Sequence, residues 1–441
     1  MLLAFSGVVL AQQSGLEPAS PGDGKQQAAV EKSGGQAVPG RYIVVLRDDA
    51  NARNVAEEHS RRLSAEVSSI YEHALRGYAA KIPSARLSEV KSDPRVLFVQ
   101  PDSTAVAFGQ TTPTGVDRID AEKSPTAQIN RIDNRVNANV AVIDTGINNT
   151  HPDLKVAGGR NFATFFSPNN NYEDGHGHGT HVAGTIAALD NNDGAVGVAP
   201  GANLYGVKVL SNSGTGFQSW IIKGIDWVTG RKAEFNNGNA DGDPGINFAV
   251  ANMSLGGSGT DSLCTSNDAY HRAICASVAA GVTYTVAAGN SNADFRNFVP
   301  ATYSEVLTVT AVSDSDGVPG GTGAVPSCRT GEKDDYPATF SNYATLADQD
   351  HTIAAPGVCI YSTWKNGGYN TISGTSMASP HVAGAAALYR AKNPTATPAE
   401  VMTALRGDAE SWAPSNGFRG DPRTSPITGR YYGYLTHADG Y

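Results

Sequence analysis

The stretch that decides the fold is NVAVIDTGINNTHPDL, residues 139–154. It opens with an apolar run of strand-forming residues, and that run ends on an acidic side chain, Asp144. A helical pattern, HVAGTIAAL (residues 181–189), follows, and then a second apolar run, NLYGVKVL (residues 203–210). Near-continuous apolar strands that alternate with helices are typical of a parallel sheet with both faces covered.

The same alternation continues toward the C-terminus. It predicts helices at residues 217–230, near 270–280, from about 376 and at 398–406, with strands NFAVANMSL, VTYTVAAG and VLTVTAV between them. We therefore predict an α/β fold with a doubly wound, mostly parallel sheet. Ligands of such sheets bind at the carboxyl ends of the strands, and Asp144 lies at one of these ends.

Length and charge limit the possible functions. The chain has 441 residues, which suits two or three domains, and 40% of them are apolar, enough for a large core. A formal net charge of −9 without a Lys/Arg cluster makes nucleic acid an unexpected partner. No apolar segment is long enough to span a bilayer, so we expect no membrane partner.

The N-terminal quarter of the sequence indicates three separate segments. Residues 1–11 resemble a secretory signal sequence that lacks its basic start, the alternative being a wrongly assigned start or a tail. Residues 12–40, rich in Gly, Gln and Ser, predict a flexible linker. Residues 41–108 predict the order β-α-β-β-α-β, a small ferredoxin-like α+β domain. The α/β domain then occupies residues 109–441.

The four cysteines are even in number, which fits two disulfides in an exported protein. Three pairings are possible, and we favour the local one, which joins Cys264 to Cys275 and Cys328 to Cys359. Their spacings are unlike a zinc-binding CxxC pair.

Three motifs carry candidate catalytic side chains. Asp144 ends a strand in VIDTGINNTHPDL, His178 begins a helix in DGHGHGTHVAG, and Ser376 begins another in SGTSMASPHVAG. A nucleophilic serine needs a base to take its proton, and the base needs a carboxylate to fix its tautomer. Strand ends and helix starts can bring these three side chains to one sheet edge.

Each motif also has a simpler interpretation. Ser376 alone is more often a helix N-cap, and the three histidines of DGHGHGTH could hold a metal ion. GTSMA also resembles the serine elbow of α/β-hydrolases, which would use Asp421 and His437 downstream of the serine. A binding protein on an inactive protease fold is a further alternative.

The motifs DTG, HGTHVAG and GTSMASP, in this order, resemble the signature of the subtilisin-like serine proteases, most closely the proteinase-K-like and aqualysin-like branch. The resemblance runs from about residue 109 to about 405. It implies a serine endopeptidase that needs no catalytic cofactor and hydrolyses polypeptides through an acyl-enzyme. Asp144 would orient the base, His178 would move the proton and Ser376 would attack. Asn290, at the end of AAGN, would bind the oxyanion together with the Ser376 N–H.

The resemblance also places the substrate. Two segments would sandwich an extended peptide, and a third would form the apolar wall of the pocket beside the scissile bond. We therefore expect broad specificity with an apolar or aromatic residue at P1, before the scissile bond. The residues concerned are Ser213, Gly214, Thr215, Gly216, Ser254, Leu255, Gly256, Ala287, Ala288 and Gly289.

A structural calcium ion is implied in the same way, since oxygen donors in a loop suit this cation. Thr352 stands where the proteinase-K-like pattern has an Asp, which argues against a second family site. The insert at residues 314–335 departs from the family pattern, and we assign it no function. The calcium ligands would be the side chains of Gln110, Asp153 and Asn191 with the carbonyls of Asp193 and Ala195.

Residues 41–108, which contain GYAAKI, resemble the family's propeptide, an intramolecular chaperone and inhibitor. The enzyme would then cut its own chain between Phe108 and Gly109, with Phe108 in the apolar pocket. We expect a secreted, self-processing monomer.

Overall fold

A computed structural model of the chain describes residues 8–10, 37–103, 109–165, 167–238, 244–345 and 347–441. The chain divides between Phe108 and Gly109 into two compact units, and the described residues 8–10 belong to the large one. Most of the expected signal and linker segments, and Phe108 itself, lie outside the described residues.

The small unit is a four-stranded antiparallel sheet with two helices, in the strand order β3-β4-β2-β5. Apolar side chains of α1, such as Val55 and Leu63, pack with Val44 and Tyr78 of the sheet to form its core. This is the predicted ferredoxin-like arrangement. Its elements are β2 (Ala37–Leu46), α1 (Ala52–Leu63), β3 (Glu66–Tyr71), β4 (Gly77–Lys81), α2 (Leu87–Ser92) and β5 (Val96–Ser103).

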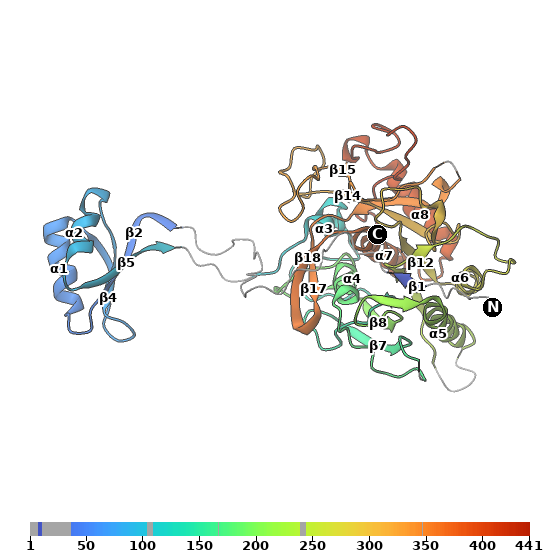
Figure 1. Cartoon of the computed structure of the whole chain (residues 1–441), viewed down its shortest axis with the longest axis horizontal. Coiled ribbons are helices and arrows are strands. Elements are labelled where there is room, and N and C mark those ends of the chain that lie inside the picture. The colour runs from blue at the N-terminus through green and yellow to red at the C-terminus, as the bar shows by residue number, and fades with distance from the viewer. Residues whose placement is uncertain (1–7, 11–36, 104–108, 166, 239–243, 346) are drawn as a thin grey trace, which may run out of the picture. The chain divides into compact units, whose positions relative to one another are not determined.

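The large unit contains a sheet with the main order β15-β14-β12-β10-β6-β8-β7, in which β16 also pairs with β14. Figure 1 labels β7, β8, β12, β14 and β15 of this sheet. All neighbours are parallel except β14 and β15. Its strands are β6 (Asn139–Asp144), β7 (Val156–Asn161), β8 (Asn203–Lys208), β10 (Phe248–Met253), β12 (Thr283–Ala287), β14 (Leu307–Ser313), β15 (Tyr336–Pro337) and β16 (Thr352–Pro356).

Helices cover both faces of this sheet, which confirms the predicted doubly wound α/β fold. Alternate residues of β6 show why: Val140 and Val142 belong to the core under α4 and α7, while Ala141 and Ile143 belong to the core under α5 and α6. The helices are α3 (Thr114–Arg118), α4 (His178–Ala187), α5 (Gln218–Asn236), α6 (Ala269–Ala279), α7 (Thr375–Lys392) and α8 (Pro398–Ser411).

Shorter strands build the surface around the sheet's carboxyl edge. They form three antiparallel pairs: β1 (Val8–Leu10) with β9 (Thr215–Phe217), β11 (Gly257–Ser258) with β13 (Phe298–Val299), and β17 (Ile360–Trp364) with β18 (Gly368–Ile372). The β17–β18 hairpin packs on α4 and leads directly into α7.

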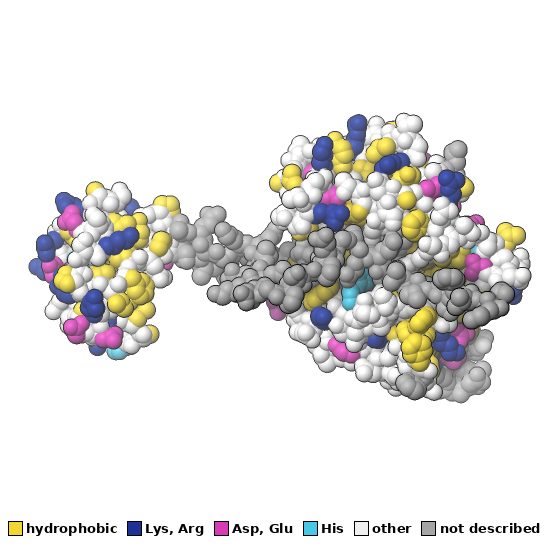
Figure 2. Space-filling view, viewed as in Figure 1, with side chains coloured by type: hydrophobic (Ala, Val, Ile, Leu, Met, Phe, Trp, Pro, Cys, Tyr) yellow, Lys and Arg dark blue, Asp and Glu magenta, His cyan; other side chains and the backbone are white. Residues whose placement is uncertain are grey.

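The structure contains both local disulfides, Cys264–Cys275 and Cys328–Cys359. The insert at residues 314–335 is fixed by a buried cation: Arg118 lies 2.8 Å from Asp335 and 3.6 Å from Asp314. On the visible face of the large unit, Lys and Arg side chains are dispersed (Figure 2). Within the described ranges, every helix is too short or too polar to cross a membrane.

Candidate active site

Asp144 is the last residue of β6, and its side chain is completely buried. Its Oδ1 accepts a hydrogen bond from the Thr145 N–H at 2.7 Å and lies 2.7 Å from Nδ1 of His178. A buried carboxylate needs such partners, because leaving an unpaired charge out of water is costly. The strand end therefore aims a carboxylate at one imidazole nitrogen.

His178 is the first residue of α4 and follows a glycine that the turn requires. Gly177 has φ +111°, and a Cβ there would lie 2.4 Å from the ring of Trp364. Burial is the largest single influence on the pKa of His178 and lowers it, but the charge and hydrogen bond of Asp144, together with the charge of Asp174, outweigh burial and raise this pKa above its ordinary value. The side chain keeps 15% of its surface exposed, so the imidazole is accessible.

Thr145 joins several parts of the site, a role that the sequence did not indicate. Its hydroxyl donates to Asp174 at 2.9 Å and accepts from the Gly179 N–H at 2.9 Å. Its carbonyl accepts a bond from the buried Nζ of Lys208, which also donates to Asn212 at 2.9 Å. Asp174 in turn accepts from three backbone N–H groups of residues 176, 177 and 180.

Ser376 does not act as a helix N-cap, because α7 already begins at Thr375 and has no side-chain capping bond. Its hydroxyl donates to the carbonyl of Ser254 at 3.2 Å, whereas a capping hydroxyl would accept from a helix N–H. The Ser254 hydroxyl donates in return to the Ser376 carbonyl at 2.8 Å. That carbonyl needs a donor, because Pro380, four residues on, has no N–H.

Asn290 lies beside this serine. Its Oδ1 accepts from the N–H of Thr375 at 2.9 Å and from the Thr375 hydroxyl at 3.0 Å. The Nδ2 donor of the amide therefore points away from Thr375. A Cβ built on Gly374 would lie 3.6 Å from both Asn290 Nδ2 and Ser376 N. The two N–H donors therefore border one small space next to the serine.

A pocket opens from this space. Small residues form much of its wall, and apolar side chains, Phe298 and Val299 of β13, close one side. Sequence reasoning missed β13, because only the folded chain brings it next to Ser254–Gly256. The lining is Ser254, Leu255, Gly256, Gly257, Ser258, Ala287, Ala288, Gly289, Asn290, Phe298, Val299, Ala301, Thr375 and Ser376.

Comparison with known proteins identifies this arrangement. The subtilase family model (peptidase S8) matches residues 136–434, and the peptidase inhibitor I9 model matches residues 41–106. The chain belongs to the subtilase family. It is thus a serine endopeptidase that carries an inhibitor-type propeptide domain.

Individual relatives agree with this family. Subtilisin J of Geobacillus stearothermophilus is 36% identical over 86% of this chain and 88% of its own. The extracellular serine proteinase of Thermus sp. (strain Rt41A) is 35% identical over 84% and 85% of the two chains. A solved cold-adapted subtilisin-like serine proteinase superposes with a TM-score of 0.52 at 33% identity, covering 74% of this subtilase and 97% of that chain.

The other histidines of this subtilase have different partners. Nε2 of His181 lies 2.9 Å from the carbonyl of Ile360, and burial lowers the pKa of His181 to about 3. The ring centroid of His176 lies 6.3 Å from that of His178. Because His178 faces Asp144 and His181 faces a carbonyl, the geometry does not favour a shared metal ion.

The elbow alternative has no geometric support either. Asp421 is buried and pairs with Arg423 at 2.8 Å, and His437 pairs with Asp439 at 2.8 Å. Both side chains are thus engaged with neighbours in the sequence, while Ser376 shares its pocket with Asn290.

The segment Ser213–Gly216 runs into β9 and does not line the pocket that contains Ser376. Nε2 of His176 would lie 3.0 Å from a Cβ at Gly214, so this segment passes close to the histidine motif. The edge of β9 accepts an extended segment of the chain itself, β1, in antiparallel register.

The five residues expected to bind calcium form one hydrogen-bonded group, which Asp193 joins through its N–H, 3.0 Å from Oδ1 of Asn191. The carboxylate of Asp153, 1% exposed, accepts from Asn191 Nδ2, from the Ala195 N–H and from the Tyr369 hydroxyl, each at 3.1 Å. Nε2 of Gln110 lies 3.2 Å from the Ala195 carbonyl. Burial raises the pKa of Asp153 to about 7. The donor set fits a calcium ion, because it joins a buried carboxylate to side-chain amides and carbonyls.

Proposed function

We propose that this subtilase is made as a secreted zymogen and cuts peptide bonds with Asp144, His178 and Ser376 as its catalytic triad. The observation that carries the proposal is the small space next to Ser376, which Asn290 Nδ2 and the Ser376 N–H border. A peptide carbonyl attacked there would meet two donors as its oxygen becomes negative. The hydrogen bond between Nδ1 of His178 and Asp144 supplies the oriented base.

Substrate preference follows from the pocket. Ala287, Ala288 and the ring of Phe298 offer apolar surface to the residue before the scissile bond, so an apolar or aromatic P1 residue would be bound best. The β9 edge pairs with an extended segment of the chain itself, β1, and this supports pairing of the same edge with a peptide backbone in place of β1. Pairing through the backbone tolerates many sequences. We therefore infer broad specificity beyond P1.

Covalent labelling tests the proposal. An arylsulfonyl fluoride should attach one sulfonyl group per chain, on the α7 peptide that contains Ser376, with loss of fluoride. His178→Ala should slow this labelling, because no base would then take the serine proton. A label found on another residue, or peptidase activity that survives full labelling of Ser376, would exclude Ser376 as the nucleophile.

The oxyanion role of Asn290 predicts a large kinetic effect. Asn290→Leu should lower kcat by about 10²–10³ with little change in KM, the loss known for the oxyanion asparagine of subtilisin. Asn290→Asp keeps an acceptor for Thr375 but removes the donor, so kcat should fall at least as far. Steady-state kinetics on a peptide anilide measure both, and normal kcat in Asn290→Asp would contradict the role.

We also propose that one calcium ion binds at Asp153 and stabilises the large unit. A proton competes for the carboxylate, because burial raises the pKa of Asp153 to about 7. Adding calcium to the chelator-treated protein should therefore raise Tm more at pH 8 than at pH 5.5. The gain corresponds to about 2.7 kcal/mol when free calcium is 100 times Kd.

Calorimetry of matched variants checks the calcium site. Asp153→Asn should lose the calcium-dependent gain in Tm. Asp193→Asn should keep it, because only the carbonyl of residue 193 would bind and an Asn side chain can still accept from the Gly194 N–H. An equal gain at both pH values, or in Asp153→Asn, would place the calcium elsewhere.

Secretion and a monomeric state complete the proposal. Secretion is supported by the two disulfides and by the name of the extracellular relative from Thermus. Fractionation of a culture that makes the protein tests the first, since activity confined to cells would contradict it. Light scattering tests the second, since a mass above one chain would contradict it.

A further inference from the structure

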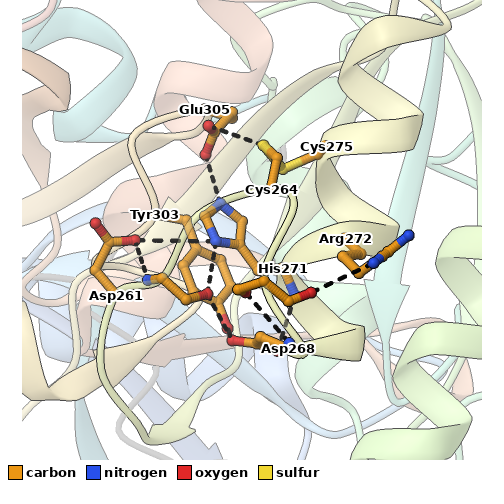
Figure 3. The surroundings of a disulfide bond; sticks show 10 residues. Asp261, Cys264, Asp268, His271, Arg272, Cys275, Tyr303 and Glu305 are labelled. Atoms are coloured by element: carbon orange, nitrogen blue, oxygen red, sulfur yellow. Dashed lines mark hydrogen bonds and ion pairs between the residues drawn. A yellow bond between two sulfur atoms is a disulfide. The ribbon is translucent and has the colours of Figure 1, made fainter.

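The Cys264–Cys275 disulfide lies in a cluster of ligand-type side chains that the peptidase reaction does not use (Figure 3). Cys275 is on α6, and His271 precedes it by four residues, so both side chains lie on one helix face. Cys264 comes from the loop before α6, and Glu305 from the loop before β14. Three separate segments thus meet here.

Their ligand atoms are close together. Nε2 of His271 lies 2.7 Å from one carboxylate oxygen of Glu305, and Sγ of Cys264 lies 3.2 Å from the other. One ligand atom from each of the four residues lies within 4.8 Å of the other three. Two sulfurs, one imidazole nitrogen and one carboxylate oxygen form a donor set that suits a four-coordinate zinc-type cation.

The imidazole is held in a fixed orientation. Nδ1 of His271 lies 3.0 Å from the hydroxyl of Ser262, which itself donates to Asp268 at 3.2 Å. The ring stacks on Tyr303 with centroids 3.9 Å apart, and His271 is 1% exposed. A hydrogen bond on one nitrogen that aims the other at the ligand site is the usual support of a metal-binding histidine. Here that other nitrogen faces Glu305.

We propose that reduction of this disulfide creates a site for one thiophilic divalent cation, bound by Cys264, Cys275, His271 and Glu305. The intact disulfide lacks thiolates, so the site exists only in the reduced chain. A phosphine reductant gives two electrons to the S–S bond and takes up oxygen from water, which leaves two thiols. The cation then displaces the two thiol protons and links the loop to α6 in place of the covalent bond.

The second disulfide provides an internal control. Sγ of Cys328 lies 3.6 Å from the hydroxyl of Ser373, and the Cys328–Cys359 pair belongs to no comparable group of ligand side chains within the described ranges. Within the described residues, its reduction yields two thiols that are not part of such a group. Metal binding should therefore depend on which pair is present.

Cobalt(II) is the probe for the experiment, in the full chain with Ser376→Ala to prevent self-digestion. The Cys328→Ser/Cys359→Ser variant should show two free thiols after phosphine treatment. It should then bind one equivalent of cobalt, with the strong visible bands of a four-coordinate ion and a thiolate charge-transfer band. Zinc should displace the cobalt. Excess calcium is present throughout, so that cobalt does not bind at oxygen-rich calcium sites.

Ligand variants in the same background assign the site. His271→Gln and Glu305→Gln should each weaken cobalt binding by about tenfold or more, whereas His437→Gln should leave it unchanged. Cys264→Ser/Cys275→Ser should show no bands, and the oxidised chain gives a second negative control should that variant not fold. Cobalt bands in either negative control would overturn the proposal. So would the absence of bands from a protein in which two free thiols have been counted, or unchanged cobalt binding in His271→Gln and Glu305→Gln.

Discussion

Ser376→Ala should abolish peptidase activity and leave the chain uncut. We expect kcat on a peptide anilide to fall by about 10⁶, the loss that removal of the nucleophile causes in subtilisin. The fold should persist, because the Ser254 hydroxyl binds the backbone carbonyl of residue 376, which alanine retains. Ser411→Ala, which removes another helix hydroxyl outside the pocket, should keep the wild-type rate.

The intact mass of the purified protein measures the same effect on the chain itself. Wild type should lose everything before about residue 109, and Ser376→Ala should retain it. Loss in both proteins would mean that another protease removes the segment. Retention in both would contradict self-processing and leave the rate measurement to decide the role of Ser376.

The sequence was sufficient for the fold because its signals are local. Apolar runs such as NVAVID and the helical patterns between them predict a parallel sheet covered on both faces, which the structure confirms. The three motifs and their order along the chain were sufficient to select the candidate catalytic residues. The structure brings Asp144 to His178, and it brings Asn290, Ser376 and two of the three expected substrate segments to one pocket.

What the sequence could not provide depends on contacts between distant segments. Phe298 and Val299 close the pocket only because β13 pairs with β11. Lys208 is an ordinary residue at a strand end, and only the fold shows its Nζ against the Thr145 carbonyl. Asp174 received no role from the sequence, although an Asp in a turn often accepts a backbone N–H bond two residues further on. Its bond to Thr145 was not visible.

Asp144→Asn should give the second largest loss and, in addition, a shift in pH dependence. Losses of about 10⁴ are known when the triad carboxylate of other serine proteases becomes an amide. The asparagine amide can donate to Nδ1 of His178, which would leave the proton on Nε2. The imidazole could then no longer accept the proton of Ser376.

The direction of the pH shift follows from the forces on His178. The base must be neutral, and in wild type the charge and hydrogen bond of Asp144, with the charge of Asp174, raise the pKa of His178 above its ordinary value despite burial. The acid limb of kcat/KM should therefore lie above pH 6.5. In Asp144→Asn the burial remains and the charge is gone, so the limb should move below pH 6.5.

The pH profile of kcat/KM separates this role from a general loss of structure. A variant that was only partly folded would lose rate without moving the acid limb. Removal of the Asp144 charge should lower both the rate and the pH at which the acid limb lies. Asp226→Asn removes a carboxylate from the exposed face of α5 and should change neither. An acid limb that stays in place in Asp144→Asn would mean that Asp174, the other carboxylate acting on His178, sets its pKa. The role of Asp144 would then be limited to fixing the tautomer of His178.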